Sequence, residues 1–154
     1  MRDENKTKDQ LINELSKLRQ RITELEVVET ELRRAEESLT QSKHRYRTLV
    51  ENVPHGIQEN DTDGIITFSN PAHSRMHGYK EGELVGRPIW EMLASEEKQE
   101  ELRQYIEMLV REQAPPTPYI TQDRTKDGKV IDIQVDWDYQ RDKEGKVTGF
   151  ISII

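Results

Sequence analysis

Leucine recurs at intervals of seven residues through the first third of the chain. If these leucines and Tyr46 occupy the d positions of a heptad repeat, the a positions also carry apolar Leu15, Ile22 and Val50. A seam that is apolar every 3.5 residues makes helices wrap around each other left-handedly, and leucine at d favours a parallel two-stranded form. Because no proline or glycine interrupts residues 1–53, we expect residues 1–50 to form a parallel homodimeric coiled coil. Its dimerisation residues are Leu11, Leu15, Leu18, Ile22, Leu25, Leu32 and Leu39.

The second half of this predicted seam is weaker than the first. Its a positions carry Glu29, Glu36 and Lys43, which place like charges opposite each other across a dimer axis. A weakly packed seam can change its register or rotation at small cost, which suits a helix that transmits a signal. Signal transmission is therefore our hypothesis for this segment. The alternative is a single solvated amphipathic helix.

Composition limits what the whole chain can be. Only 32% of its 154 residues are apolar and 34% are charged, which leaves too few apolar residues for a fully globular body of this length. Cysteine is absent, and no apolar run approaches the roughly 20 residues that a membrane span needs. These features favour a cytoplasmic fragment and leave open a membrane anchor elsewhere in a parent protein. The net charge of −7 lies entirely within residues 46–154, which argues against nucleic-acid binding.

The rest of the chain predicts a small α+β domain that begins with two short strands. These strands, over residues 56–60 and 64–70, are separated by the turn sequence DTDG. Asn70 is a favourable N-cap and Pro71 fits the first helical position, so a short helix begins there. Gly78 ends it.

A longer helix and three strands should follow. Two glycines and a proline break residues 81–93 into single helical turns, and Ser95 begins the longer helix. Asp127 and Gly128 predict a two-residue hairpin turn, and a second turn near Gly145 leads to the last strand. The apolar stripe of the longer helix is Leu102, Tyr105, Ile106 and Leu109. The strand after the hairpin carries, on one face, Ile131, Ile133, Val135, Trp137 and Tyr139.

Five segments taken together resemble a PAS domain. In order over residues 45–154 they read RYRTLVENVPHGI, DTDGIITFSNPA, HGYKEGELVG, RTKDGKVIDIQV and DKEGKVTGFISI. The resemblance implies a five-stranded antiparallel sheet flanked by short helices and one longer helix, over residues 51–154, after the coiled coil of residues 1–50. It also implies a non-catalytic sensory module of a bacterial signalling receptor, such as a histidine kinase of a two-component system or a cyclic-di-GMP enzyme.

The family pattern usually continues after the last strand into an Asp-(Ile/Val)-Thr linker that leads to an effector. This chain stops at Ile154, before such a linker. We therefore expect the chain to be the N-terminal part of a larger receptor with an effector domain in cis.

His73 and His77 lie four residues apart, on one face of the predicted short helix. Ala72 and Met76 form the apolar pair expected to face the sheet, so the two histidines are expected at the surface. Zinc would need further ligands in tetrahedral geometry, and Gly78 breaks the helix before another ligand could extend that face. We expect no metal site.

The resemblance also bears on cofactors. Haem-binding PAS domains carry their proximal histidine on the helix that here reads PIWEML, which has none, and His44 and His55 are poorly placed. Light-sensing relatives form a flavin adduct through a cysteine, which this chain lacks. Haem and covalent flavin are therefore disfavoured. A non-covalently bound flavin stacked on Trp90 is a distant alternative.

Aspartates alternate with the apolar residues of strand 130–139. Asp132, Asp136 and Asp138 project from the polar face, and a two-residue hairpin places Asp123 opposite Asp132. Clustered carboxylates could bind a hard cation or act as an acid and a base. Alternate polar residues of a half-buried strand are usually its solvated face, however. With no Ser-His-Asp grouping, phosphate loop or HExxH motif in the sequence, we do not expect an enzyme.

A small-molecule pocket is expected between the sheet and the short helices. The two-residue hairpin would put Gln122 opposite Ile133 on the inward face, where its amide would need a partner; a strand bulge would cancel this placement. The ligand would be an unidentified organic molecule, with no cofactor. The alternative is a purely structural dimerisation unit whose core is filled by its own side chains. The predicted ligand-binding residues are Ile66, Phe68, Met76, Trp90, Leu93, Ile120, Gln122, Ile133 and Val135.

Overall fold

The computed structural model describes residues 7–154 and divides into two units, one up to Arg47 and one from Thr48 to Ile154. The first element, α1 (Lys8–Asn52), is one continuous helix of 45 residues. Thr7 N donates to Gln10 Oε1 (2.9 Å) and Gln10 N donates to Thr7 Oγ1 (3.4 Å), a capping box that satisfies free N–H groups at the helix start. The helix ends at Asn52 because Pro54 disfavours helical backbone at the residue before it. The part of the predicted coiled coil before Thr7 lies outside the described residues.

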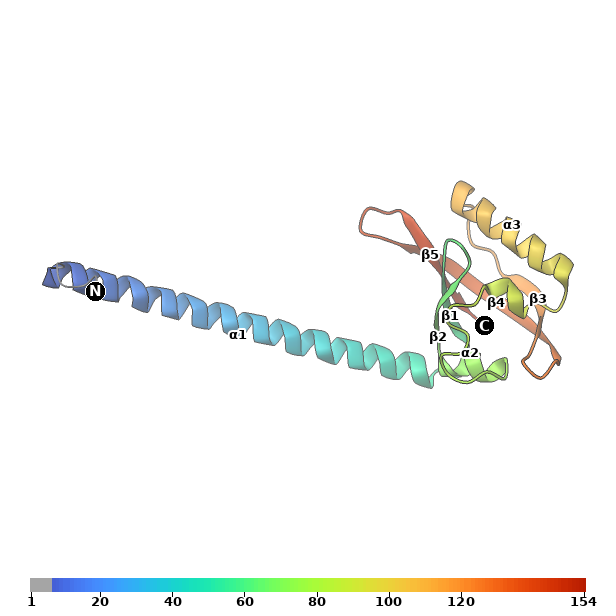
Figure 1. Ribbon diagram of the computed structural model, residues 1–154, viewed down its shortest axis with the longest axis horizontal. Coiled ribbons are helices and arrows are strands. Elements are labelled where there is room, and N and C mark those ends of the chain that lie inside the picture. Colours follow the sequence, from blue (N-terminus) through green and yellow to red (C-terminus); the bar gives the residue numbers. More distant parts are fainter. Residues whose placement is uncertain (1–6) are drawn as a thin grey trace. The chain divides into compact units, whose positions relative to one another are not determined.

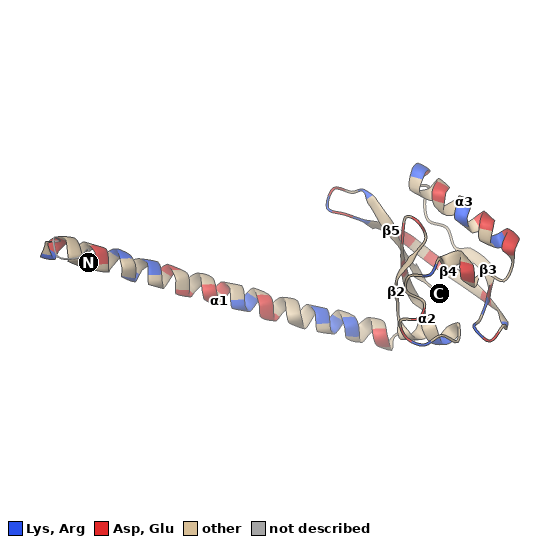
Figure 2. Cartoon of the chain, in the orientation of Figure 1, with Lys and Arg blue, Asp and Glu red and all other residues tan. Residues whose placement is uncertain are grey.

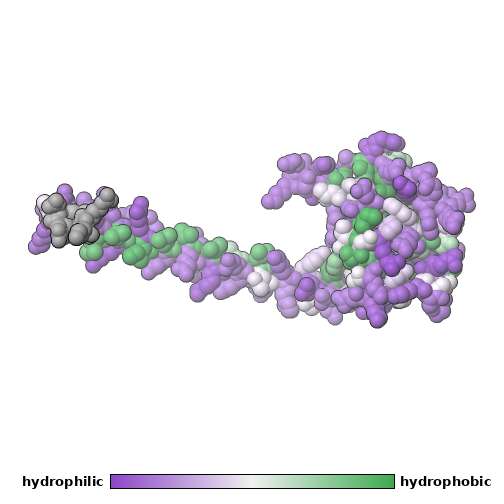
Figure 3. All heavy atoms as spheres, viewed as in Figure 1, coloured by the Kyte–Doolittle hydropathy of each residue, from purple (hydrophilic) through white to green (hydrophobic). Residues whose placement is uncertain are grey.

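The apolar side chains of α1 form a stripe along the helix (Figure 3). The predicted seam residues are exposed in the single chain, from 44% at Leu11 to 67% at Leu25. Residues of both charge signs are distributed along the whole length of the helix (Figure 2). Because α1 buries only Val50 of its residues, it gains almost no tertiary stabilisation from its own chain. Within residues 7–154, no helix combines the length and apolar character that crossing a bilayer requires.

The second unit is built on a five-stranded antiparallel sheet (Figure 1). In spatial order the strands are β2 (Ile66–Ser69), β1 (Ile57–Asp61), β5 (Val147–Ile153), β4 (Val130–Arg141) and β3 (Tyr119–Arg124). The predicted order of two strands, several helices and three antiparallel strands is confirmed.

Three helical segments lie between β2 and β3: α2 (Pro71–Met76), the 3-10 turn η1 (Ile89–Met92) and α3 (Glu96–Glu112). α2 stops at Gly78, which takes a φ of 75° while Tyr79 N donates to the carbonyl of Ser74. Ile106 and Leu109 of α3 pack on Phe150 of β5, which confirms the predicted apolar stripe. A second small core joins Ile66, Leu84 and Met92.

The hairpin between β3 and β4 has a three-residue loop, so the predicted two-residue turn is wrong. Thr125 N donates to the carbonyl of Lys129 (2.8 Å), and Gly128, with a φ of 86°, is the last loop residue. The register is therefore displaced by one residue, with Thr121 opposite Ile133. Because side chains alternate along a strand, this displacement exchanges the two faces of β3.

Candidate functional site

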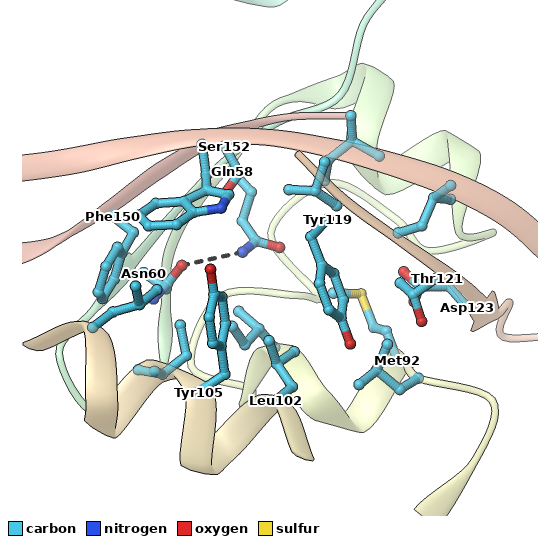
Figure 4. A pocket seen from close by; sticks show the side chains of 18 residues that line it. Gln58, Asn60, Met92, Leu102, Tyr105, Tyr119, Thr121, Asp123, Phe150 and Ser152 are labelled. Carbon is cyan, nitrogen blue, oxygen red and sulfur yellow. Dashed lines mark hydrogen bonds between the residues drawn. The ribbon is translucent and has the colours of Figure 1, made fainter. Parts of the chain in front are cut away.

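A cavity of about 70 Å³ lies between the sheet and the segments η1 and α3 (Figure 4). Since a water needs roughly 10–15 Å³ of such volume, the cavity has room for a molecule of a few heavy atoms. Its walls are mainly apolar and aromatic, with a few polar side chains. From the helical segments they include Ile89, Met92, Leu93, Leu102, Tyr105, Ile106 and Leu109. From the strands and the C-terminus they include Gln58, Asn60, Tyr119, Thr121, Asp123, Ile133, Val135, Trp137, Phe150, Ser152 and Ile154.

Four aromatic rings line this cavity. Tyr105 on α3 lies nearly parallel to Tyr119 on β3, with 6.4 Å between ring centroids and 17° between planes. Trp137 meets Tyr105 edge to face at 6.3 Å and Phe150 at 5.6 Å. The Trp137 indole N–H donates to the carbonyl of Thr117 (2.8 Å), which fixes that ring. The cavity is therefore bounded by rigid aromatic surfaces rather than by flexible aliphatic chains alone.

Gln58 brings a polar group to the cavity from β1. Its side chain is 4% exposed, and its Nε2 donates to Asn60 Oδ1 at 3.4 Å (Figure 4). Asn60 in turn donates to the backbone carbonyl of Asp61 (2.9 Å). Among the described residues, the Gln58 Oε1 atom has no hydrogen-bond partner, so it is an acceptor available to a ligand or water.

Asp123 contributes a carboxylate that is bonded on one side only. The residue is 3% exposed, and its Oδ2 lies 2.8 Å from His77 Nε2. The other ring nitrogen, His77 Nδ1, lies 3.1 Å from the backbone carbonyl of His73. The contact between His77 and Asp123 joins the end of α2 to the cavity wall.

His73 is also fully buried, beside His77. Its Nδ1 lies 2.9 Å from Ser69 Oγ, whereas its Nε2 is buried with no hydrogen-bond partner in the described part of the chain. Burial, with the neighbouring charge of His77 second, lowers the pKa of His73 to about 3. The surface position expected for both histidines is wrong. The face of α2 that carries His73 and His77 points into the domain, where Ser69 and Asp123 supply polar partners.

Asn70 joins the end of α1 to the domain. Its Nδ2 donates to the carbonyls of Val50 and His55, each at 3.0 Å, and its Oδ1 accepts from Ile57 N and His73 N, each at 2.9 Å. The last of these is the predicted N-cap bond of α2. All four hydrogen-bonding capacities of this buried amide are therefore used.

The structure brings three of the nine predicted ligand-binding residues to the cavity: Leu93, Ile133 and Val135. Ile120 is 75% exposed, and Gln122 is exposed and donates to Asp132 on the outer face, so the inward orientation expected for both is wrong. The one-residue change in hairpin register is the cause.

The other four predicted residues lie outside the cavity lining. Ile66 is buried in the second core, and Trp90 packs over Gly64. Met76 is half-buried on α2. A bulge at Thr67 of β2 leaves Phe68 paired with Glu59, on the sheet face opposite to Gln58, so its expected inward orientation is also wrong.

Sequence reasoning missed Tyr119, Thr121 and Asp123 as cavity residues. All three lie at alternate positions of β3 and would have been found with a three-residue hairpin loop. Asp123 faces Ile131 rather than Asp132, which corrects the predicted carboxylate pair. The remaining aspartates of β4 are exposed. Within residues 7–154, no group of three or more His, Asp or Glu side chains could hold a metal ion.

Comparison with known proteins decides the family. The family described as the PAS fold matches residues 44–154, which is most of the chain. The chain belongs to the PAS family. The PAS domain of an HTR-like protein from Haloarcula marismortui is 23% identical, with a TM-score of 0.64 over 79% of this chain and 96% of that one. No curated protein matches the chain significantly.

Other solved PAS domains share the same fold. One from Colwellia psychrerythraea is 19% identical, with a TM-score of 0.63 over 72% of this chain and 92% of that one. Another, from a LuxR-family transcriptional regulator of Burkholderia thailandensis and in complex with ethanol, is 14% identical, with a TM-score of 0.57 over 71% and 95%. PAS domains are generally non-catalytic sensory modules, so the globular part of this chain is a signal-sensing module.

Proposed function

We propose that this PAS domain senses a small organic molecule that binds in the cavity beneath α3. The cavity itself carries the proposal, because it contains unpaired oxygen acceptors of Gln58 and Asp123 inside a mainly apolar and aromatic wall. Small-molecule sites typically combine an apolar lining with a few polar groups of this kind. The PAS domain from B. thailandensis was solved in complex with ethanol, which supports a ligand about the size of ethanol for this cavity.

The same proposal assigns α1 to dimerisation and relay. Its exposed heptad stripe suits a parallel coiled coil with a second copy of the chain. Two routes could carry the signal: β5, which lines the cavity through Phe150 and Ser152, and β1, which begins next to the lining residue Gln58 and is joined through Asn70 to the last turn of α1. A ligand can shift the output only through different affinities for two states. The output itself would be a histidine kinase or a cyclic-di-GMP enzyme that follows in cis.

A purely structural dimerisation unit is the second candidate, favoured by the small cavity volume of about 70 Å³. A non-covalent flavin has less support, because Trp90, its expected stacking partner, packs over Gly64 outside the cavity lining.

Fragment binding to the whole chain tests the sensory proposal. In NMR spectra of ¹⁵N-labelled protein, compounds of up to about six heavy atoms should shift the indole N–H resonance of Trp137, which lines the cavity, and leave that of Trp90 in place. Val135→Phe should fill the cavity and abolish these shifts. Val130→Phe, at a 50% exposed position of the same strand, is the matched control and should retain them. A folded wild-type protein whose Trp137 responds to no fragment would favour the structural candidate.

A further inference from the structure

The unpaired atoms of the cavity restrict the chemistry of a ligand. Gln58 Oε1 and Asp123 Oδ1 form no hydrogen bond with any described residue, although both side chains are more than nine-tenths buried. Figure 4 shows the Gln58 oxygen directed into the cavity, with Asp123 on the side of Thr121. The contact with His77 uses the other carboxylate oxygen, Oδ2, so Oδ1 can accept a hydrogen bond. Both oxygens can therefore accept a hydrogen bond from a ligand or from water.

The other polar groups of the lining do not change this preference for a ligand that donates hydrogen bonds. Tyr105, Tyr119, Thr121 and Ser152 present hydroxyls, each of which can donate or accept. No lysine or arginine is among the lining residues. A bound anion would therefore meet two oxygen acceptors with no lysine or arginine to pair with it, which is costly in a buried site.

The aromatic rings favour a positive charge. Tyr105, Tyr119, Trp137 and Phe150 surround the space, and the faces of such rings attract ammonium groups. An ammonium group also has three N–H donors and no acceptor. The preference for a donor and the preference for a cation thus coincide.

We propose that the cavity selects a small protonated primary amine, whose N–H groups bond the free oxygen of Asp123 or of Gln58 among the aromatic rings. The cavity volume of about 70 Å³ limits such a ligand to a few carbon atoms. This inference rests on the proposed sensory function and adds the chemical class of its ligand.

Three probes with the same carbon skeleton test the inference: n-propylamine, n-propanol and propionate, titrated into the full chain at neutral pH. Shifts of the Trp137 indole N–H give the affinity, and the Trp90 resonance is the internal control. Propylamine should bind at least about tenfold more tightly than propanol, because hydrogen bonds to charged groups are the stronger ones. Propionate should cause no saturable shift.

Two substitutions identify the acceptor. Gln58→Met keeps the length of the side chain and removes the oxygen, and Asp123→Asn removes the carboxylate; at least one of them should weaken propylamine binding about tenfold or more. Gln122→Met is the matched control, because Gln122 lies on the outer face, and should bind like wild type. Asp123 also contacts His77, so its substitution could destabilise the domain. The amine affinities of wild type and variants are therefore compared at temperatures where their thermal unfolding curves give the same folded fraction.

The outcomes separate this inference from the proposed function. If propanol binds as tightly as propylamine, if propionate saturates, or if neither substitution weakens amine binding, the amine class is overturned and the sensory cavity stands. If none of the three probes and no small fragment shifts Trp137 in the folded protein, both are overturned.

Discussion

A histidine buried without a charge partner makes a domain sensitive to acid. His73 is enclosed by Ser69, His77 and the backbone of Gly56, and its pKa is lowered from 6.5 to about 3. As the pH falls below 6.5, the unfolded chain therefore binds a proton on this side chain before the folded chain does. The stability that His73 contributes is complete above about pH 6.5 and is lost progressively toward pH 3.

We predict that His73→Asn flattens this pH dependence. Between pH 7 and pH 5, protonation of His73 in the unfolded state alone should lower the free energy of unfolding by about 2 kcal/mol. Asparagine can still bond Ser69 and does not titrate, so the variant should lack this part of the slope. Urea unfolding at a series of pH values measures the difference. Parallel pH profiles of the two proteins would contradict it.

The burial of these histidines could not be predicted from their own helix. The spacing of Ala72 and Met76 predicted that their face of the helix would pack on the sheet. Imidazole is a polar group, so the histidines were expected at the surface. Ser69 precedes the helix closely, but Asp123 lies 46 residues beyond His77 in the chain. Only the sheet register brings that carboxylate beneath α2, so a local pattern holds no signal for it.

At the level of elements, the order of strands and helices could be predicted because each element depends on local patterns. Alternation identified β4, the i, i+3, i+4 stripe identified α3, and the Asn70-Pro71 pair located the start of α2. The sheet face on which each side chain lies, by contrast, depends on single inserted residues. One additional loop residue before Gly128 exchanged the faces of β3, and one bulge in β2 turned Phe68 away from the cavity.

For α1 we predict a parallel homodimer that two substitutions dissociate. Leu18→Asp with Leu25→Asp puts charges into the seam, where no partner compensates them, and should yield monomers in light scattering at tens of micromolar. Gln20→Asp with Val27→Asp, at two outward f positions of the same heptads, is the matched control and should stay dimeric.

Because the sequence contains no cysteine, a single introduced cysteine can test whether the two helices are parallel or antiparallel. Leu11→Cys should oxidise to a covalent dimer if the helices are parallel, because equivalent d positions then face each other. A monomeric wild-type protein, or a Leu11→Cys variant that does not cross-link under oxidising conditions, would contradict the prediction.

At the scale of the whole molecule, the two units differ in what stabilises them. The unit from Thr48 onward has buried cores of its own, whereas the unit up to Arg47 consists of an exposed helix. A helix of this kind is stable in water mainly through pairing. In the predicted dimer, the charged a positions at Glu29, Glu36 and Lys43 would set how strongly the two helices pair after their apolar first half.

We predict that leucine at these three a positions strengthens the dimer by several kcal/mol, on the order of 1 kcal/mol for each buried side chain. The midpoint of urea unfolding at fixed protein concentration should rise. Leucine at the f positions Gln20, Arg34 and Gln41 is the control and should leave it almost unchanged. An equal response of both triple variants would place the charged residues outside the seam.

The Asn70 amide determines how this sensor can be recombined with other proteins. Its two donors hold carbonyls at Val50 and His55, and its oxygen holds two N–H groups of the domain. Asn70→Asp would turn acceptors toward both carbonyls, and no aliphatic residue would bond any of the four groups. A chimera that exchanges the helix for another coiled coil should therefore be joined before Thr48, in heptad phase, so that the native backbone from Thr48 onward travels with the domain.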